Sequence, residues 1–256
     1  MHGIQIARPN VVRRPLCLVT GGATGLGFEL ARAFAEARCD LVIAGDGTVD
    51  LALAAEELAA QVPEVEIHWV SADLSRGTGP ATLHNKLRTL ERPIDIFVAN
   101  TSVGAWGDYG RVASLDDELA TGQINTLSTL HLSRLIAKDM AARGGGRIVL
   151  ASSHSASSCA FDTLQSATRA FTTALADGLR LEFEGGGVLV TSLCPEVEAE
   201  GPCLRIQDPA ALNDFARAVR AGVSGRGPAK KPSALPDDLQ TRYQRYLVLS
   251  AESPRA

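Results

Sequence analysis

The chain has 256 residues, of which 45% are hydrophobic and 21% charged, the composition of a globular protein that can bury a full core. Its net charge is −4, no apolar run has membrane-spanning length, and the N-terminus lacks the apolar core of a signal peptide. These features predict a cytoplasmic protein with neither nucleic-acid nor membrane partners. The five cysteines include no CxxC pair and no neighbouring histidine ligands, so we expect neither a metal site nor a disulfide framework.

A strand, a glycine turn and a helix follow a polar arm that covers residues 1–15. The apolar run 16–19 has the length of a buried strand, and apolar side chains then recur at helical spacing as far as Phe34. Glycine lets a ligand approach the backbone closely, and a helix N-terminus presents free N–H groups, so the junction predicts a site for the phosphates of a dinucleotide. A tight turn that binds nothing is the alternative. The candidate residues at the junction are Gly21, Gly25, Leu26 and Gly27.

Strands and helices alternate through the rest of the chain. The expected strands span 40–44, 65–72, 94–99, 147–151 and 188–193, and the expected helices span 49–61, 80–90, 115–143 and 162–184. This alternation predicts an α/β fold, a doubly wound parallel sheet with helices on both faces, in three layers and a single domain. Beyond Pro195 the pattern weakens, with helices expected over 208–221 and 236–249 and no clear seventh strand. We therefore divide the domain into a dinucleotide-binding core, residues 16–195, and a C-terminal segment, residues 196–256, that frames a substrate mouth.

These features together resemble the short-chain dehydrogenase/reductase family over roughly residues 16–195. The resemblance rests on Thr20 and the glycines after it, on Ala72-Asp73-Leu74, on Asn100 after the fourth strand, on Asn125 in the long helix, and on the fifth strand leading to Ser153. It implies a Rossmann-type fold that binds NAD or NADP, with Asp73 holding the adenine and Asn100 at the cofactor. It also implies that Ser153 and Asn125 stand at two of the family's catalytic positions.

The sequence departs from the family at the two other catalytic positions. The family uses a tyrosine to exchange a proton with the substrate oxygen and a lysine four residues later to lower the tyrosine pKa. The downstream sequence that resembles the family places Phe161 and Gln165 at those positions. Phenylalanine has no hydroxyl and glutamine has no charge, so neither performs the family's role. The segment between Ser153 and Phe161 is also shorter than in the family, and no tyrosine lies between Tyr109 and Tyr243.

A carbonyl reduction needs a group that protonates or stabilises the developing alkoxide. Ser153 and Asn125 remain available as hydrogen-bond donors. Of the possible substitute acids, His154 has a suitable intrinsic pKa and follows the strand end closely. A solvated loop histidine is the alternative for that residue. The other candidates, which are equally open to an inert interpretation, are Tyr109, Cys159 and Asp162.

The end of the second strand bears on the choice between NAD and NADP. By resemblance, NAD-binding members carry an acid at the end of this strand, and NADP-binding members tend to place an arginine one position later. Gly45 and Asp46 occupy the two positions here, and Thr24 adds no basic group to the glycine loop. A carboxylate at Asp46 would repel a 2′-phosphate, which favours NAD over NADP. The alternative is that Asp46 only caps the turn before the next helix.

Two functions follow from these residues. The first is an atypical NAD(P)-dependent oxidoreductase that acts on a small carbonyl or alcohol without the tyrosine–lysine pair. The second is a catalytically silent dinucleotide-binding module, a pseudoenzyme without a substrate, that senses cofactor or stabilises a partner subunit. The family resemblance also implies a homodimer or homotetramer whose interface is formed by helices 115–143 and 162–184, although the apolar positions of these helices equally suit packing on the sheet.

Overall fold

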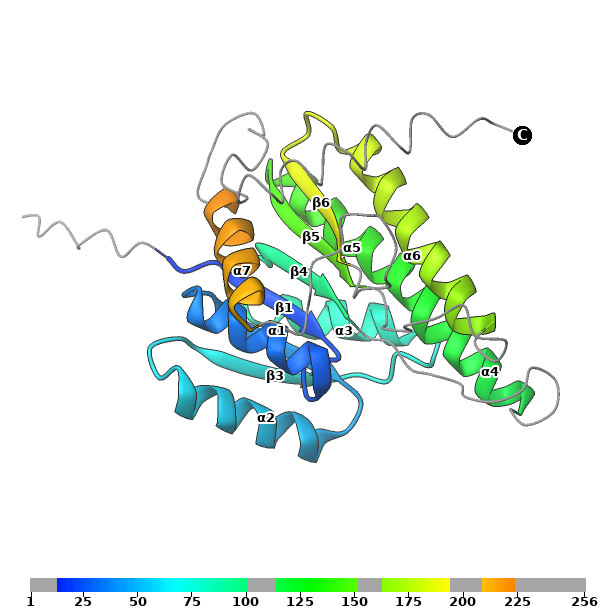
Figure 1. Ribbon diagram of the computed structural model, residues 1–256, viewed down its shortest axis with the longest axis horizontal. Helices are drawn as coiled ribbons and strands as arrows, with labels where there is room; N and C mark the ends of the chain where they lie inside the picture. The colour runs from blue at the N-terminus through cyan, green and yellow to red at the C-terminus, as the bar shows by residue number, and fades with distance from the viewer. Residues whose placement is uncertain (1–12, 101–113, 152–162, 194–208, 224–256) are drawn as a thin grey trace, which may run out of the picture.

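Six parallel strands form one sheet in the computed structural model, which describes residues 13–100, 114–151, 163–193 and 209–223 (Figure 1). The strand order is β3-β2-β1-β4-β5-β6, and every neighbouring pair is parallel. This is the doubly wound order of a Rossmann-type fold, as the alternating pattern predicted. The strands are β1 (Leu16–Thr20), β2 (Asp40–Gly45), β3 (Ile67–Ser71), β4 (Ile96–Ala99), β5 (Gly146–Ala151) and β6 (Val188–Leu193).

Burial explains which apolar runs became strands. All five residues of β1 are buried, as expected for a central parallel strand covered on both faces. At the edge of the sheet, β3 is shorter than the expected strand 65–72, and its Trp69 is 40% exposed. The expected strand followed the alternation of apolar and polar residues. The strand in the structure is shorter, because its register with β2 covers only Ile67 to Ser71.

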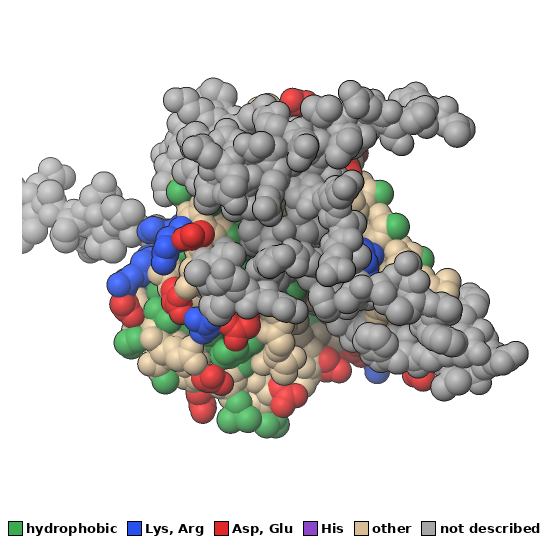
Figure 2. Space-filling view, in the orientation of Figure 1, with side chains coloured by type: hydrophobic (Ala, Val, Ile, Leu, Met, Phe, Trp, Pro, Cys, Tyr) green, Lys and Arg blue, Asp and Glu red, His purple; other side chains and the backbone are tan. Residues whose placement is uncertain are grey.

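Among the helices of the described segments, three pack on each face of the sheet. The sheet thus lies between two helical layers (Figure 1). The first face carries α1 (Gly25–Glu36), α2 (Thr48–Gln61) and α7 (Pro209–Val223), and the second carries α3 (Gly79–Arg88), α5 (Thr129–Ala142) and α6 (Thr163–Glu182). The rings of Phe34 in α1 and Phe215 in α7 meet edge to face, with their centroids 6.4 Å apart. This contact joins α7 to the hydrophobic core on the first face, which we call the first core. Figure 2 shows acidic, basic and hydrophobic side chains interspersed over the face that α1 and α2 form.

The segment 115–143 is not the single α-helix that its periodicity predicted. It consists of α4 (Leu115–Gly122), a π-helical segment η1 (Gln123–Ser128) and then α5. The hydroxyl of Thr126 donates to the carbonyl of Gly122 at 2.5 Å, which adds a side-chain bond to a carbonyl of the helix. Such a local bond accompanies the change of helical winding, and π segments inside α-helices are frequently found at functional sites.

The described segments contain no helix that is both long enough and apolar enough to cross a bilayer. They also contain no group of three or more histidine, cysteine, aspartate or glutamate side chains placed to hold a metal ion. The arm over residues 1–12 and the expected helix 236–249 lie outside the described residues. Cys17 is fully buried in β1, as expected for a small core residue, and burial raises the pKa of its thiol well above the usual value.

Candidate functional site

The crevice where a ligand binds in a doubly wound sheet lies at the carboxyl ends of the strands where the order reverses. Here that point lies between β1 and β4, because β1 has β2 on one side and β4 on the other. The residues that leave these two strands are Gly21 and Asn100. The strand order therefore brings two predicted cofactor residues, 79 positions apart in the sequence, to the same place.

The glycine loop has the shape of a phosphate cradle. Gly21 and Gly25 adopt positive φ angles of 66° and 55°, a conformation that side chains disfavour. A Cβ added to Gly25 would meet no atom within 4 Å, so this position borders open space. At Thr24, the residue before α1, no side chain caps the helix, and the first turn has no acidic residue. The N–H groups at the start of α1 thus remain available to an anionic ligand.

Gly27 has a different role in the same loop. It is buried in the first turn of α1, and a Cβ added there would lie against the carbonyl oxygen of Gly21 and 2.5 Å from Nδ2 of Asn100. The absence of a side chain lets the helix begin in contact with the loop. Leu26 next to it is partly buried and packs against the first core. The structure thus gives Gly27 and Leu26 packing roles, while Gly21 and Gly25 shape the cradle.

Asn100 joins the ends of β4 and β1. Its backbone N–H donates to Oγ1 of Thr20 at 3.1 Å, and its side-chain amide donates to the carbonyl of Gly21 at 3.5 Å. Thr20 in turn donates to the carbonyl of Val98 in β4 at 3.4 Å. These bonds fix the glycine loop from the side of β4, so Asn100 orients the cradle.

Asp73 lies in the loop between β3 and α3. Its Oδ1 accepts the hydroxyl of Ser75 at 2.5 Å and the backbone N–H of Ser75 at 3.0 Å, and its Oδ2 accepts Nε of Arg76 at 2.9 Å. The hydrogen bond from the Ser75 hydroxyl, followed by that from Arg76, lowers the pKa of Asp73 below its usual value of 3.8. The carboxylate is therefore an ionised acceptor, which suits the exocyclic amine of an adenine.

This lowered pKa keeps the Asp73 carboxylate ionised between about pH 5 and pH 8, so a contact that it made with an adenine would contribute equally over that range. Because the pKa of the group in the folded protein is depressed, its charge and its contribution to stability are lost only as the pH falls through that low value. We expect Asp73→Asn to weaken ADP-ribose binding about tenfold at both pH values, as for loss of a hydrogen bond to a charged group. Calorimetry on both proteins checks this, and a difference that vanishes at pH 5 would contradict the lowered pKa.

Asp46 follows β2 and is exposed. Its Oδ1 accepts the N–H of Gly47 at 3.0 Å, in a turn where Gly47 has a φ of 87°. This contact is the turn-capping alternative considered from the sequence. It occupies one carboxylate oxygen, so the second oxygen remains available to a ribose hydroxyl, and the capping and ribose-binding roles are compatible.

A buried polar seam lies between the α4–η1 segment and α6. Asn125 in η1 is 5% exposed and Gln165 in the first turn of α6 is 3% exposed. The two elements pack against each other, and each contributes one of these buried amides. Gln165 is the residue that the family resemblance aligned with the lysine position. The buried polar residues of these elements are Thr121, Asn125, Ser128, Gln165, Thr168 and Thr172.

Several predicted residues lie outside the described residues. The chain is described as far as Ala151 at the end of β5 and again from Thr163 at the start of α6. The predicted residues in this gap and in the segment 101–113 are Ser153, His154, Cys159, Phe161, Asp162 and Tyr109. Ser128 is a residue that the sequence did not indicate, since one serine in a helical pattern has no distinguishing signal. It is 2% exposed and bonds to the loop that carries Asp73.

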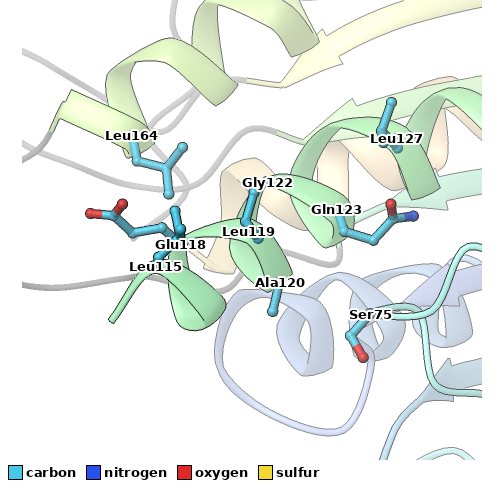
Figure 3. A pocket seen from close by; sticks show the side chains of 9 residues that line it. All are labelled: Ser75, Leu115, Glu118, Leu119, Ala120, Gly122, Gln123, Leu127 and Leu164. Carbon is cyan, nitrogen blue, oxygen red and sulfur yellow. The ribbon is translucent and has the colours of Figure 1, made fainter. Parts of the chain in front are cut away.

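An apolar hollow of about 670 Å³ lies beside the seam, on its outer side (Figure 3). Figure 3 shows Leu115, Leu119 and Glu118 of α4 near Leu164 of α6, with Gln123 and Ser75 at the other end. Leu115 and Leu119 are 67% and 61% exposed. Because none of the glycine-loop residues lines this hollow, we distinguish it from the nucleotide crevice.

Comparison with known proteins agrees with this geometry. Residues 15–199 match the family model described as short chain dehydrogenase. Ketoacyl reductase HetN of Nostoc sp. is 29% identical over 180 residues, which cover 70% of this chain and 61% of that protein. The 1-deoxy-11-beta-hydroxypentalenate dehydrogenase of Streptomyces avermitilis is 34% identical over 187 residues, 70% of this chain and 66% of that protein. The matched parts are thus less than two thirds of these relatives' lengths.

Solved structures share the fold over most of the chain. A short-chain dehydrogenase from Sphingobium yanoikuyae, determined in complex with NADPH, superimposes with a TM-score of 0.68 at 24% identity. The match covers 94% of this chain and 97% of that one. At this identity the likeness concerns the fold alone.

Proposed function

The chain belongs to the short-chain dehydrogenase family, and on that premise we propose that it is an NAD(P)-dependent oxidoreductase acting on a small carbonyl or alcohol. The observation that supports this proposal best is the cradle at the switch point, where Gly21 and Gly25 shape the loop and Asn100 fixes it. The loop at Asp73 supplies an ionised acceptor for adenine. These residues would hold the cofactor, whose nicotinamide supplies or accepts the hydride.

The proposed chemistry is atypical because the tyrosine and lysine positions hold Phe161 and Gln165. Asn125 and Ser153 would hydrogen-bond the substrate oxygen, and His154 is the first candidate for the substitute acid. Loss of a positioned general acid removes about a hundredfold to ten-thousandfold in rate, so we expect slow turnover compared with relatives that have the tyrosine.

A second candidate function is a silent dinucleotide-binding module. The observation that favours it is the burial of Gln165, whose neutral amide is 3% exposed beside the segment that carries Asn125. Because an amide carries no charge, it would hold the nicotinamide end without tuning a proton donor. The module would sense cofactor or stabilise a partner subunit.

One set of measurements separates these functions. We would titrate the purified protein with NAD, NADH, NADP and NADPH by calorimetry and then screen small carbonyls and alcohols for turnover. Binding with turnover that His154→Ala or Tyr109→Phe abolishes supports the oxidoreductase and identifies its acid. Binding without turnover favours the silent module, and no binding at about millimolar nucleotide contradicts both.

The cofactor preference that we propose is NAD. It is supported by the exposed carboxylate of Asp46 after β2, which would accept from ribose hydroxyls and repel a 2′-phosphate. The NADPH in the Sphingobium structure belongs to a chain that is 24% identical, and the residues after β2 decide this contact individually. Tighter binding of NADP than of NAD in the titration would overturn the preference.

We also propose that the chain forms a homodimer or homotetramer through α4 and α6. The support is the apolar surface around the hollow in Figure 3, where Leu115 and Leu119 are exposed together. Leu119→Glu should then shift the protein to monomers in sedimentation velocity, because a carboxylate buried at an interface is costly. Leu53→Glu is the matched control, since Leu53 on α2 is 59% exposed and lies away from this surface. A monomeric wild type would contradict the assembly.

A further inference from the structure

A single buried hydroxyl connects η1 with the loop that follows β3. Oγ of Ser128 donates to the carbonyl of Leu74 at 2.6 Å, between residues 54 positions apart in the sequence. Ser128 is 2% exposed and Leu74 is 5% exposed, so the bond is shielded from water. Shielding strengthens a hydrogen bond and makes its loss costly, because a buried donor or acceptor without a partner keeps its desolvation penalty.

The hydroxyl of Ser128 is held from its own helix as well. Nε2 of Gln123, at the start of η1, donates to Oγ of Ser128 at 3.3 Å. Oγ therefore accepts one bond and donates another, and the direction of its proton toward Leu74 follows from that arrangement. The two ends of the π-helical segment are bridged by the same side chain that reaches the loop.

Each end of the Ser128–Leu74 bond carries a residue of the proposed site. Leu74 directly follows Asp73, whose carboxylate is fixed by Ser75 and Arg76. Ser128 lies three residues after Asn125 in the same π segment. One hydrogen bond thus joins the backbone at the adenine acceptor to the segment that holds the asparagine of the nicotinamide end.

We propose that Ser128 is a positioning residue that fixes the adenine subsite at Asp73 relative to Asn125; this inference rests on the proposed dinucleotide function. A ligand that occupies both subsites binds best when their separation matches its own length, because the second contact is then intramolecular. A fragment that occupies only the adenine subsite is indifferent to the separation. The bond therefore contributes to the affinity for a whole dinucleotide and not to the affinity for AMP.

Ser128→Ala tests this role, and the chain offers a matched control for it. Ser133 lies on α5, is 1% exposed, and its hydroxyl has no hydrogen-bond partner among the described residues. Ser133→Ala therefore makes the same chemical change at a buried position without breaking a bond. We expect Ser128→Ala to weaken NADH binding about tenfold and to change AMP binding less than about twofold, with both affinities unchanged in Ser133→Ala.

A second variant and a second measurement keep the test independent of overall stability. Gln123→Ala removes only the bond that orients the hydroxyl, and we expect it to weaken NADH binding about threefold. Without any nucleotide, hydrogen exchange at residues 123–128 should be faster in Ser128→Ala than in Ser133→Ala.

Three outcomes would overturn the inference. Ser128→Ala could bind NADH like the wild type, it could lose NADH and AMP affinity equally, or its exchange could match that of Ser133→Ala. Failure of the proposed function is a separate result, which appears as a wild-type protein that binds no dinucleotide.

Discussion

Gly27→Ala is expected to weaken dinucleotide binding more than about a hundredfold and to lower the free energy of unfolding by about 1–3 kcal/mol. The added methyl group would lie within 3.0 Å of the carbonyl oxygen of Gly21 and of Nδ2 of Asn100, separations that real Cβ atoms do not adopt. The Asn100 side chain could move, but the Gly21 carbonyl belongs to the backbone. The substitution therefore displaces either the start of α1 or the glycine loop itself.

Gly27→Ala has two opposite effects on the free energy of unfolding, and their magnitudes decide whether the substitution stabilises or destabilises the protein. Alanine inside a helix is favoured over glycine by about 0.5–1 kcal/mol, which would stabilise α1. The steric conflict with Gly21 is larger, because the loop is also tied to β2 by the bond from Gly21 N–H to the Ala44 carbonyl at 2.7 Å. A shift of the loop would break that tie and reshape the cradle.

Gly178→Ala is the control for this prediction. Gly178 lies in α6, and a Cβ added there would meet no atom within 4 Å. The same substitution should stabilise the protein by about 0.5–1 kcal/mol there and leave nucleotide affinity unchanged. Thermal unfolding and calorimetry measure both quantities, and Gly27→Ala with wild-type affinity would contradict the cradle as the phosphate site.

The glycine loop was predictable because its requirements are local. A strand, a turn with free φ angles and a helix start follow one another within about twelve residues, and glycine is the residue type that satisfies the turn. The parallel sheet with helices on both faces also followed, since alternating strands and helices are joined by right-handed crossovers. Gly21, Gly25 and Asn100 accordingly lie where the sequence placed them.

The π segment and the role of Ser128 depend on contacts that the sequence does not encode locally. Apolar periodicity cannot distinguish the hydrogen bonds of an α-helix, which join residues four apart, from those of a π-helix, which join residues five apart. One long helix was therefore the natural prediction for 115–143. The bond from Ser128 to Leu74 joins distant segments on one side of the sheet, and no pattern within either segment indicates it. The predicted strand 65–72 was longer than β3 for a related reason, because the pairing with β2 decides where β3 begins and ends.

The family resemblance aligned Gln165 with the family's lysine position. Because Gln165 is buried, the change from a charged to a neutral side chain there would have a physical consequence. Thr168, one turn along α6, and Asn125 on the adjoining η1 are also buried, and Arg169 on α6 has a buried Nε. Thr168 donates its hydroxyl to the Gln165 carbonyl at 3.1 Å, which leaves the polar end of the Gln165 side chain directed by other contacts.

Gln165→Lys is expected to lower the free energy of unfolding by about 2–4 kcal/mol at pH 7, because it would bury an ammonium at a position that is 3% exposed. Burial lowers the pKa of the new lysine below its usual value of about 10.4, so the unfolded state holds the proton more tightly than the folded state. The deficit is complete below the lowered pKa and shrinks as the pH rises toward about 10.4. Urea unfolding at about pH 7 and pH 10 measures this change.

Gln61→Lys provides the matched control, since Gln61 is exposed at the end of α2 and its amide already bonds Glu57 at 3.0 Å. A lysine there gains an ion pair with Glu57 and a favourable place at a helix C-terminus, so stability should change by less than about 0.5 kcal/mol. If Gln165→Lys is equally mild and independent of pH, the seam retains partners for an ammonium, and the proposal of a silent module loses its support. A large deficit that shrinks at high pH would instead show that the seam suits a neutral amide, so that any turnover must draw its proton from elsewhere.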